Sequence, residues 1–414
     1  MSTTLPRRFG TRGLRASAAL AGVAALLSAC APAQAVVRRG SPQPLHAGSL
    51  TAVDVGAAQR AFSVDLVRAV CGTSAKGNVV VSGTSAAEAL GLLYAGARGT
   101  TADAVGKVLH LPAWDAALVA AVAGHTQALG SIRGPKKDEG LFLSNRVWSA
   151  KGNPPTQQYL DDVATAYASD ARTVDFAGDP GGATNAINAT VDKDTRGLIK
   201  KLFDGPLPRD TVTVLTNAMY LKATWLTPFE MSAPTDFHAV GGVESVPMMS
   251  GASGAGRSSS GWRSVELPYV GGKLSAVAIL PPAGTPPCSL TTSLYDALIQ
   301  GTPAVTDVRM PKLHFEQSRD LLGVLTDMGL PLTGDYSGVG GATSISQVVQ
   351  KTYLDVDEQG TTAAAATGVT MPASRLMTVE PPLVLDRPFL FVLTDAATHS
   401  PLFTAVVNDP TQKG

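Results

Sequence analysis

Residue types that could do catalytic chemistry are present, but their spacing forms no known catalytic motif. The sequence holds no Gly-x-Ser-x-Gly, Ser-x-x-Lys or His-Glu-x-x-His pattern. A Lys-Thr-Gly motif is also missing, because Lys351-Thr352 continues with Tyr353. The six histidines are scattered singly, without metal-ligand spacing. We therefore expect no enzyme, no metal and no cofactor; an active site without a catalogued motif is the remaining alternative.

The run EQGTTAAAATG at 358–368 is unusual for a segment between two expected strands. The uncharged stretch extends from Gly360 to Ser374 and contains one proline, Pro372. Alternate residues of a strand share a face. One such face would hold only small or β-branched side chains: Thr361, Ala363, Ala365, Thr367 and Val369. This segment could enter a sheet without burying a charge. A flexible linker is the simpler interpretation.

Composition excludes some classes of partner. Basic and acidic residues balance at 33 each, which argues against general nucleic-acid binding. Apolar residues make up 44% of the 414 residues, enough for a large core.

The N-terminus has the pattern of an export signal. Four arginines precede a short apolar run at 18–27, followed by Leu-Ser-Ala-Cys at 27–30. This ending resembles a bacterial lipobox, in which Cys30 is lipidated and becomes the new N-terminus. We expect a signal at 1–29, a lipid anchor and flexible tether at 30–50, and anchoring to the outer face of the cell membrane. The alternative is a secreted protein cleaved near residues 33–35.

The remaining chain, 51–414, is expected to form one α+β domain, because helical patterns dominate its first half and strand patterns its second. Helices are expected at 54–70, 85–97, 155–168 and 185–203, with Thr100 capping a further one. Strands are expected at 78–82 and 211–221, with a hairpin at 265–281 and a flexible loop at 250–261. Cys71 and Cys288 could form a disulfide or remain two buried thiols.

Several segments, in order along the chain, resemble the serpins, a superfamily of serine protease inhibitors. The similarity covers about residues 54–411. Its main segments are NVVVSGTSAAEALGLLYAG (78–96), LTNAMYLKATWLTPFE (215–230), VRMPKLHFE (308–316), DRPFLFVLTD (386–395) and VVNDP (406–410).

The resemblance implies a serpin fold, with a large central mixed sheet, smaller sheets, about eight or nine helices and an exposed reactive-centre loop at about 358–386. A protease attacks this loop, forms a covalent acyl-enzyme and is trapped when the loop inserts into the central sheet. The implied hinge residues are Glu358, Gly360, Thr361, Ala363, Ala365 and Thr367. The partner would be a serine protease or, as a second option, a cysteine protease, and the inhibitor would be a monomer. The alternative is a non-inhibitory serpin that serves as a binding or structural protein.

The family's usual offset from Glu358 places the reactive bond at Ser374–Arg375, and a shift of one residue places it at Arg375–Leu376. Arg375 before the cut would suit a trypsin-like specificity pocket. Ser374 would suit the small pockets of elastase-like or subtilisin-like proteases.

By resemblance, four polar residues control sheet opening: Ser82, Ser85, Asn188 and Gln350. Simple core hydrogen bonding is the alternative role. The sequence departs from the family's pattern at Gly83, usually proline, at Gln350, often histidine, and at Thr362, often glutamate.

Overall fold

The structure is a computed structural model that describes residues 35–45, 48–73, 77–134, 136, 139–152, 154–340, 342–361 and 380–412. The expected signal, with Cys30, lies outside the described residues. So do residues 362–379, which contain the expected reactive bond at Ser374, Arg375 or Leu376 and the hinge residues Ala363, Ala365 and Thr367.

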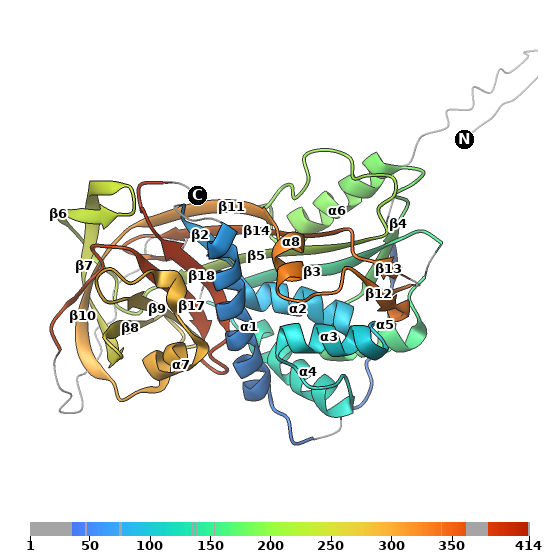
Figure 1. Cartoon of the computed structure of the whole chain (residues 1–414), viewed down its shortest axis with the longest axis horizontal. Coiled ribbons are helices and arrows are strands. Elements are labelled where there is room, and N and C mark those ends of the chain that lie inside the picture. The colour runs from blue at the N-terminus through green and yellow to red at the C-terminus, as the bar shows by residue number, and fades with distance from the viewer. Residues whose placement is uncertain are drawn as a thin grey trace, which may run out of the picture. The chain divides into compact units, whose positions relative to one another are not determined.

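Eight α-helices occur in the described part of the chain, within the expected eight or nine (Figure 1). They are α1 Ala52–Thr73, α2 Gly83–Tyr94, α3 Gly99–Leu109, α4 Ala116–Gly130, α5 Gln157–Tyr167, α6 Pro180–Asp194, α7 Thr292–Gln300 and α8 Leu322–Asp327. Two short 3-10 turns, η1 Pro287–Ser289 and η2 Ser337–Val339, complete the helical elements of these residues. None of the described helices is long and apolar enough to cross a membrane.

The central sheet is mixed, as expected, and has seven strands in the described part of the chain. Its order is β1 Val36–Arg38, β4 Ala171–Val174, β3 Gly140–Ala150, β5 Thr213–Thr224, β15 Gly360–Thr361, β14 Gln347–Val356 and β11 Leu313–Asp320. The β3–β4 and β5–β14 pairs are parallel, and the other neighbours are antiparallel.

A second sheet has nine strands. The path runs β16 Leu383–Val384, β10 Ala304–Pro311, β7 Gly242–Ser259, β8 Trp262–Pro268, β9 Leu274–Leu280, β17 Phe389–Asp395, β18 Pro401–Val407 and β2 Val79–Val81, and β6 Glu230–Ala239 pairs with β7. Strands β12 Thr333–Tyr336 and β13 Ala342–Ser344 form a small third sheet. The hairpin expected at 265–281 is confirmed as β8–β9.

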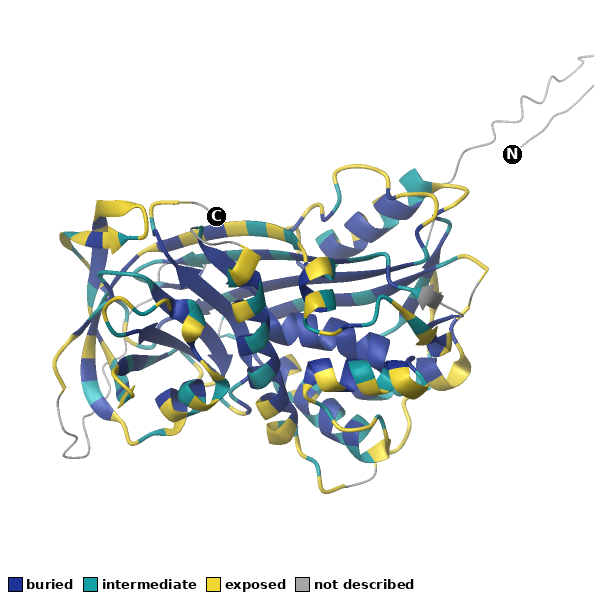
Figure 2. Cartoon of the chain, viewed as in Figure 1, coloured by how far each residue is buried: buried dark blue, intermediate teal, exposed yellow. Residues whose placement is uncertain are grey.

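The two faces of the central sheet are covered by different helices (Figure 1). On one face, Ile187 of α6 packs with Trp148 of β3 and Val214 of β5. On the other lies α2, all twelve residues of which are buried, as Figure 2 shows in dark blue. A disulfide joins Cys71 of α1 to Cys288 of η1, so pairing is the correct one of the two alternatives.

Two expected boundaries are wrong. The helix expected over 185–203 ends at Asp194, because Arg196 (φ 56°) and Gly197 (φ 83°) turn left-handed. Thr100 is not a cap: α3 begins at Gly99, with Arg98 in the cap position and no side-chain cap.

Two segments expected to be flexible are strands instead. Residues 250–261 look like a loop because they are small and polar, but most belong to β7, whose backbone pairs with β8 and β10. Within the expected tether, residues 36–38 form β1 on the edge of the central sheet. The backbone N–H of Ser41 then donates to Asp161 Oδ1 at 2.8 Å, and that of Gln43 to Thr165 Oγ1 at 2.8 Å.

Candidate functional site

The hinge begins inside the central sheet. Strand β15 lies between β5 and β14, with Gly360 opposite Thr224 and Thr361 opposite both Ala223 and Val356. Further along, β5 and β14 pair directly over six residue pairs, from Gln347–Val214 to Thr352–Met219. We call this β5–β14 boundary the seam. The seam is therefore open at one end, where the hinge enters, and closed over the six pairs.

Thr361 is fixed by an aromatic pair at the open end of the seam. Its side chain is 1% exposed, and its Oγ1 lies 2.6 Å from Tyr269 Oη. The Tyr269 ring stacks on Trp225 with ring centroids 4.2 Å apart. Trp225 Nε1 in turn donates to the carbonyl of Asp357 at 3.0 Å. Trp225 thus both packs on Tyr269 and holds the hinge backbone.

Backbone hydrogen bonds and close packing set the hinge's path. The N–H groups of Trp225 and Phe229 donate to the carbonyls of Gln359 (2.9 Å) and Glu358 (2.8 Å). Gly360 has φ 157°, and a β-carbon there would come within 2.1 Å of the Ala223 carbonyl oxygen. Only glycine fits this position without displacing β5.

The charge of Glu358 is compensated where the hinge begins. Its Oε1 lies 2.8 Å from Nζ of Lys312, at the junction of β10 and β11. Burial alone would raise the pKa of Glu358, but the hydrogen bond and charge of Lys312 outweigh it and hold this pKa below its usual value. The ion pair ties the start of the hinge to the β10–β11 junction.

A group of buried polar side chains spans the closed part of the seam. We call it the polar cluster; its members are Ser82, Ser85, Glu88, Asn145, Asn217 and Gln350. Gln350 and Asn217 face each other across the seam, and Gln350 Nε2 donates to Asn217 Oδ1 at 2.8 Å. Gln350 also accepts from the N–H of Ser82 and donates to its carbonyl, both at 2.9 Å.

The chain of hydrogen bonds continues from Asn217 across β3 into α2. Asn217 Nδ2 donates to Ser85 Oγ (2.5 Å) and to Asn145 Oδ1 (3.0 Å). Asn145 Nδ2 donates to Glu88 Oε2 at 2.8 Å. Burial raises the pKa of Glu88 to about 7, although the hydrogen bond from Asn145 acts in the opposite direction. The polar cluster therefore ends on a carboxyl that titrates near neutral pH.

The structure brings together three of the four residues expected to control sheet opening. Asn188 lies apart from them on α6, where its Oδ1 accepts from the N–H groups of Leu202 and Phe203 at 2.8 and 3.1 Å. These bonds hold the segment that follows α6. A role for any of the four in opening stays a prediction.

Sequence reasoning missed Glu88, Asn145 and Asn217. Asn217 lies in the segment 215–230, which carries the family resemblance, but it was given no role. Glu88 could have been noticed because it is the single charged residue in the apolar segment 85–97. Two departures from the family pattern also have local reasons. A β-carbon on Gly83 would come within 1.8 Å of Ser63 Oγ, so proline does not fit, and the amide of Gln350 serves as both donor and acceptor.

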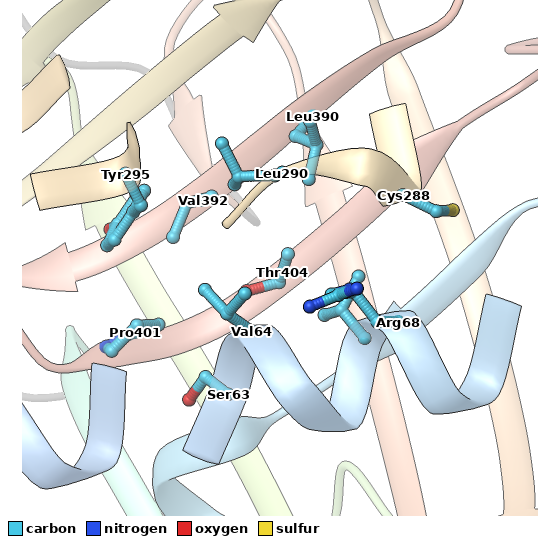
Figure 3. Close-up of a pocket in the computed structure, with 11 residues that line it drawn as sticks. Ser63, Val64, Arg68, Cys288, Leu290, Tyr295, Leu390, Val392, Pro401 and Thr404 are labelled. Carbon is cyan, nitrogen blue, oxygen red and sulfur yellow. The ribbon is translucent and has the colours of Figure 1, made fainter. Parts of the chain in front are cut away.

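An apolar slot lies between α1 and the strands β17 and β18 (Figure 3). Val64, Leu390 and Val392 are among its lining residues, and its volume is only about 20 Å³. That is room for about one water molecule, so the slot is no ligand site. The described residues also contain no group of three or more potential metal ligands.

The comparisons with known proteins agree with this fold. The family model "Serpin (serine protease inhibitor)" matches residues 57–410. An uncharacterized serpin-like protein from Thermococcus kodakarensis is 34% identical over 364 residues, covering 84% of each chain. Alpha-1-antiproteinase 2 from Equus caballus is 31% identical over 374 residues, covering 85% of this chain and 86% of the relative.

Among solved structures, a thermophilic serpin, tengpin, in its native state gives a TM-score of 0.77 at 24% identity. The match covers 91% of this chain and 100% of that chain. The chain belongs to the serpin family, whose members are generally protease inhibitors rather than enzymes.

Proposed function

We propose that this protein is an inhibitory serpin that traps a serine protease as a covalent acyl-enzyme. The observation that carries the proposal is the hinge, of which Gly360 and Thr361 already occupy a strand position in the seam. The next residues are uncharged to Ser374 and mostly small, so the sheet can receive them without burying a charge.

The observed register predicts where each inserted residue would lie. Thr361 pairs with Ala223 and Val356, and both pairings are antiparallel. Continued in this register, Ala363 falls between Leu221 and Leu354. Thr367 then falls between Asn217 and Gln350, the two residues that bond across the closed seam. Its hydroxyl can donate and accept, so it can replace the hydrogen bond that insertion breaks.

The chemistry belongs to the protease. Its nucleophile attacks the carbonyl carbon of the residue before the cut, Ser374 or Arg375, and the peptide nitrogen of the next residue leaves with a proton. The loop is then free to enter the seam while its end stays esterified. If about ten residues each gain about 1 kcal/mol of net hydrogen bonding, insertion yields on the order of 10 kcal/mol.

Localisation is a second part of the proposal. The Leu-Ser-Ala-Cys motif at 27–30 supports lipidation of Cys30 and anchoring to the outer face of a membrane. Secretion after cleavage near residues 33–35 is the alternative.

The competing function is that of a non-inhibitory serpin acting as a binding or structural protein. Charges or prolines in the hinge would favour it, and the sequence has neither between Gly360 and Thr370. The slot in Figure 3 is too small to hold a small-molecule ligand.

The test is a titration of trypsin, elastase and subtilisin with residues 31–414, followed by residual protease activity. We expect one of the three to be inactivated near equal stoichiometry. The mass of the released C-terminal peptide then assigns the reactive bond to Ser374–Arg375 or Arg375–Leu376. Cleavage of the loop by all three enzymes with full activity remaining would support the non-inhibitory alternative.

A further inference from the structure

The N-terminal segment enters the fold at one end of the central sheet. In β1, Val36 pairs with Thr173 and Arg38 with Ala171, so the chain enters beside the end of β4 and runs inward. Strand β4 is parallel to β3, and the end of β3 lies beside the start of β5, with Ser149 opposite Thr213. Residue 35 therefore lies at the Thr213 end of β5.

The described part of the hinge lies at the other end of the same strand. Gly360 pairs with Thr224, the last residue of β5. The eleven steps from Thr213 to Thr224 correspond to about 36 Å at the usual strand rise. Figure 1 shows the two ends apart. Strand β4, beside the Thr213 end, lies at the right, and β6, which follows the Thr224 end of β5 along the chain, lies at the left.

Only a short stretch of chain separates Cys30 from residues 35–45, which are held against the fold. Five residue steps separate Cys30 from Ala35, a reach of at most about 18 Å. Residues 35–45 add nothing to this reach, because β1 and the bonds of Ser41 and Gln43 hold them against β4 and α5. A lipid on Cys30 would thus hold the Thr213 end close to the bilayer.

We propose that the short, docked N-terminal segment orients the anchored inhibitor, with the Thr213 end of the sheet toward the membrane and the reactive loop away from it. This proposal rests on the lipidation of Cys30 proposed above. Its consequence is a partner class: soluble proteases that approach from the surrounding medium, rather than proteases whose active sites lie at the surface of the same membrane.

The test measures energy transfer from a fluorescent label to headgroup acceptors in the bilayer. The full chain is processed and lipidated in a bacterial host, checked by mass for acylated Cys30, and reconstituted into phosphatidylcholine vesicles with one-fifth phosphatidylglycerol. Labels are placed by Lys151→Cys at the Thr213 end and by Met231→Cys near the hinge; the two native side chains are 74% and 76% exposed. The disulfide of Cys71 and Cys288 leaves the introduced thiol as the labelling site in the described residues.

We expect transfer from position 151 to exceed that from position 231 by at least about threefold, given the roughly 36 Å separation of the two ends. The double substitution Val36→Pro/Val37→Pro should shrink this ratio, because proline breaks the β1–β4 ladder and lengthens the tether. Val36→Thr/Val37→Thr, which keeps strand propensity, should leave the ratio unchanged.

Equal transfer from the two positions, or a reversed ratio, would overturn the proposal, as would an unacylated Cys30. Protease trapping by the same samples in detergent separates the two proposals. Intact trapping with equal transfer refutes the orientation alone, whereas lost trapping with a threefold ratio refutes the inhibitory function alone.

Discussion

Glu88 places a titratable carboxyl at the end of the hydrogen-bonded cluster that crosses the seam. It also lines a cavity of about 380 Å³, together with Arg133, Arg146, Tyr167 and Asp194. Arg146 Nη2 is bonded to Asp194 at 3.1 Å, so this arginine does not neutralise Glu88 directly. Folding raises the pKa of Glu88 because its side chain is buried, which favours the protonated form.

The raised pKa of Glu88 predicts a pH dependence of stability. This pKa rises from its usual 4.5 to about 7 on folding, so the folded state binds more protons between these values. The free energy of unfolding should therefore fall as pH rises from about 4.5 through about 7, by a total of about 3 kcal/mol. Glu88→Gln keeps an acceptor for Asn145 and should remove this loss, which thermal midpoints measured between about pH 5 and about pH 8 would show.

The comparison with wild type isolates Glu88 from other buried groups. Burial lowers the pKa of His125 to about 4, so its contribution is lost as pH falls, in the opposite direction. That contribution is the same in both proteins and cancels in the difference. Parallel pH curves for wild type and Glu88→Gln would refute the role given to Glu88.

Thr367 gives a second prediction at the residue scale. The register places its hydroxyl between Asn217 and Gln350 after insertion. Thr367→Val should leave the uncleaved protein unchanged but destabilise the cleaved, inserted form by about 1–3 kcal/mol, because buried amide groups lose a partner. Denaturant unfolding of both forms measures this, with Thr367→Ser as the conservative control. An equal effect on both forms would contradict the register.

At the scale of elements, the two-residue strand β15 is the part of the hinge that lies between two strands of the central sheet. It is held by Tyr269, Trp225 and the Lys312–Glu358 ion pair, and it separates β5 from β14 at one end. A segment that starts in place needs only to extend an existing pairing, which avoids forming the first contacts of a new strand.

Thr361→Arg should therefore turn the inhibitor into a substrate. The side chain is buried in the starting state, and an arginine would carry an unpaired charge into the seam. We expect at least a tenfold rise, in order of magnitude, in the molecules cleaved per protease inactivated, whereas Thr361→Val should stay within about twofold of wild type. Trapping by Thr361→Arg with wild-type efficiency would contradict the insertion mechanism.

Most elements could be predicted from the sequence because their patterns are local. Hydrophobic spacing along the chain is enough to predict the helices at 54–70 and 85–97. The hairpin at 265–281 is predicted in the same local way, from two strand patterns joined by Gly271–Gly272. The strand at 250–261 could not be predicted, because its small polar residues are ordered by pairing with β8 and β10, which lie elsewhere in the chain. Strand β1 was missed for the same reason.

The site residues also fall into two groups, those that the sequence reveals and those that only the folded structure brings together. The uncharged hinge is a local signal, and Ser82, Ser85 and Gln350 were found through resemblance. Their connection through Asn217 and Asn145 to Glu88 depends on three strands and a helix meeting in space, which no spacing in the sequence reveals.

On the scale of the whole molecule, a nearly closed seam occurs in a chain whose sequence carries no charge from Gly360 to Ser374. If insertion yields on the order of 10 kcal/mol, the uncleaved protein is held by a kinetic barrier rather than by greatest stability. Opening requires the Asn217–Gln350 bond and five further pairs of the seam to separate.

Cleavage of the loop by a protease that escapes trapping should therefore stabilise the protein. The inserted strand would add hydrogen bonds on both sides, so we expect the thermal midpoint to rise by roughly 10 °C or more. Calorimetry of cleaved and intact protein at one scan rate makes the comparison. A cleaved form that melts at or below the intact protein would show that the loop does not insert.

Covalent trapping is tested most simply by a denaturing gel of the protein mixed with each candidate protease and then boiled. We expect a band at the summed mass of inhibitor and protease less the released C-terminal peptide, with Ser374 or Arg375 esterified to the protease nucleophile. Cleaved inhibitor without such a band, beside fully active protease, would contradict trapping and identify a non-inhibitory serpin.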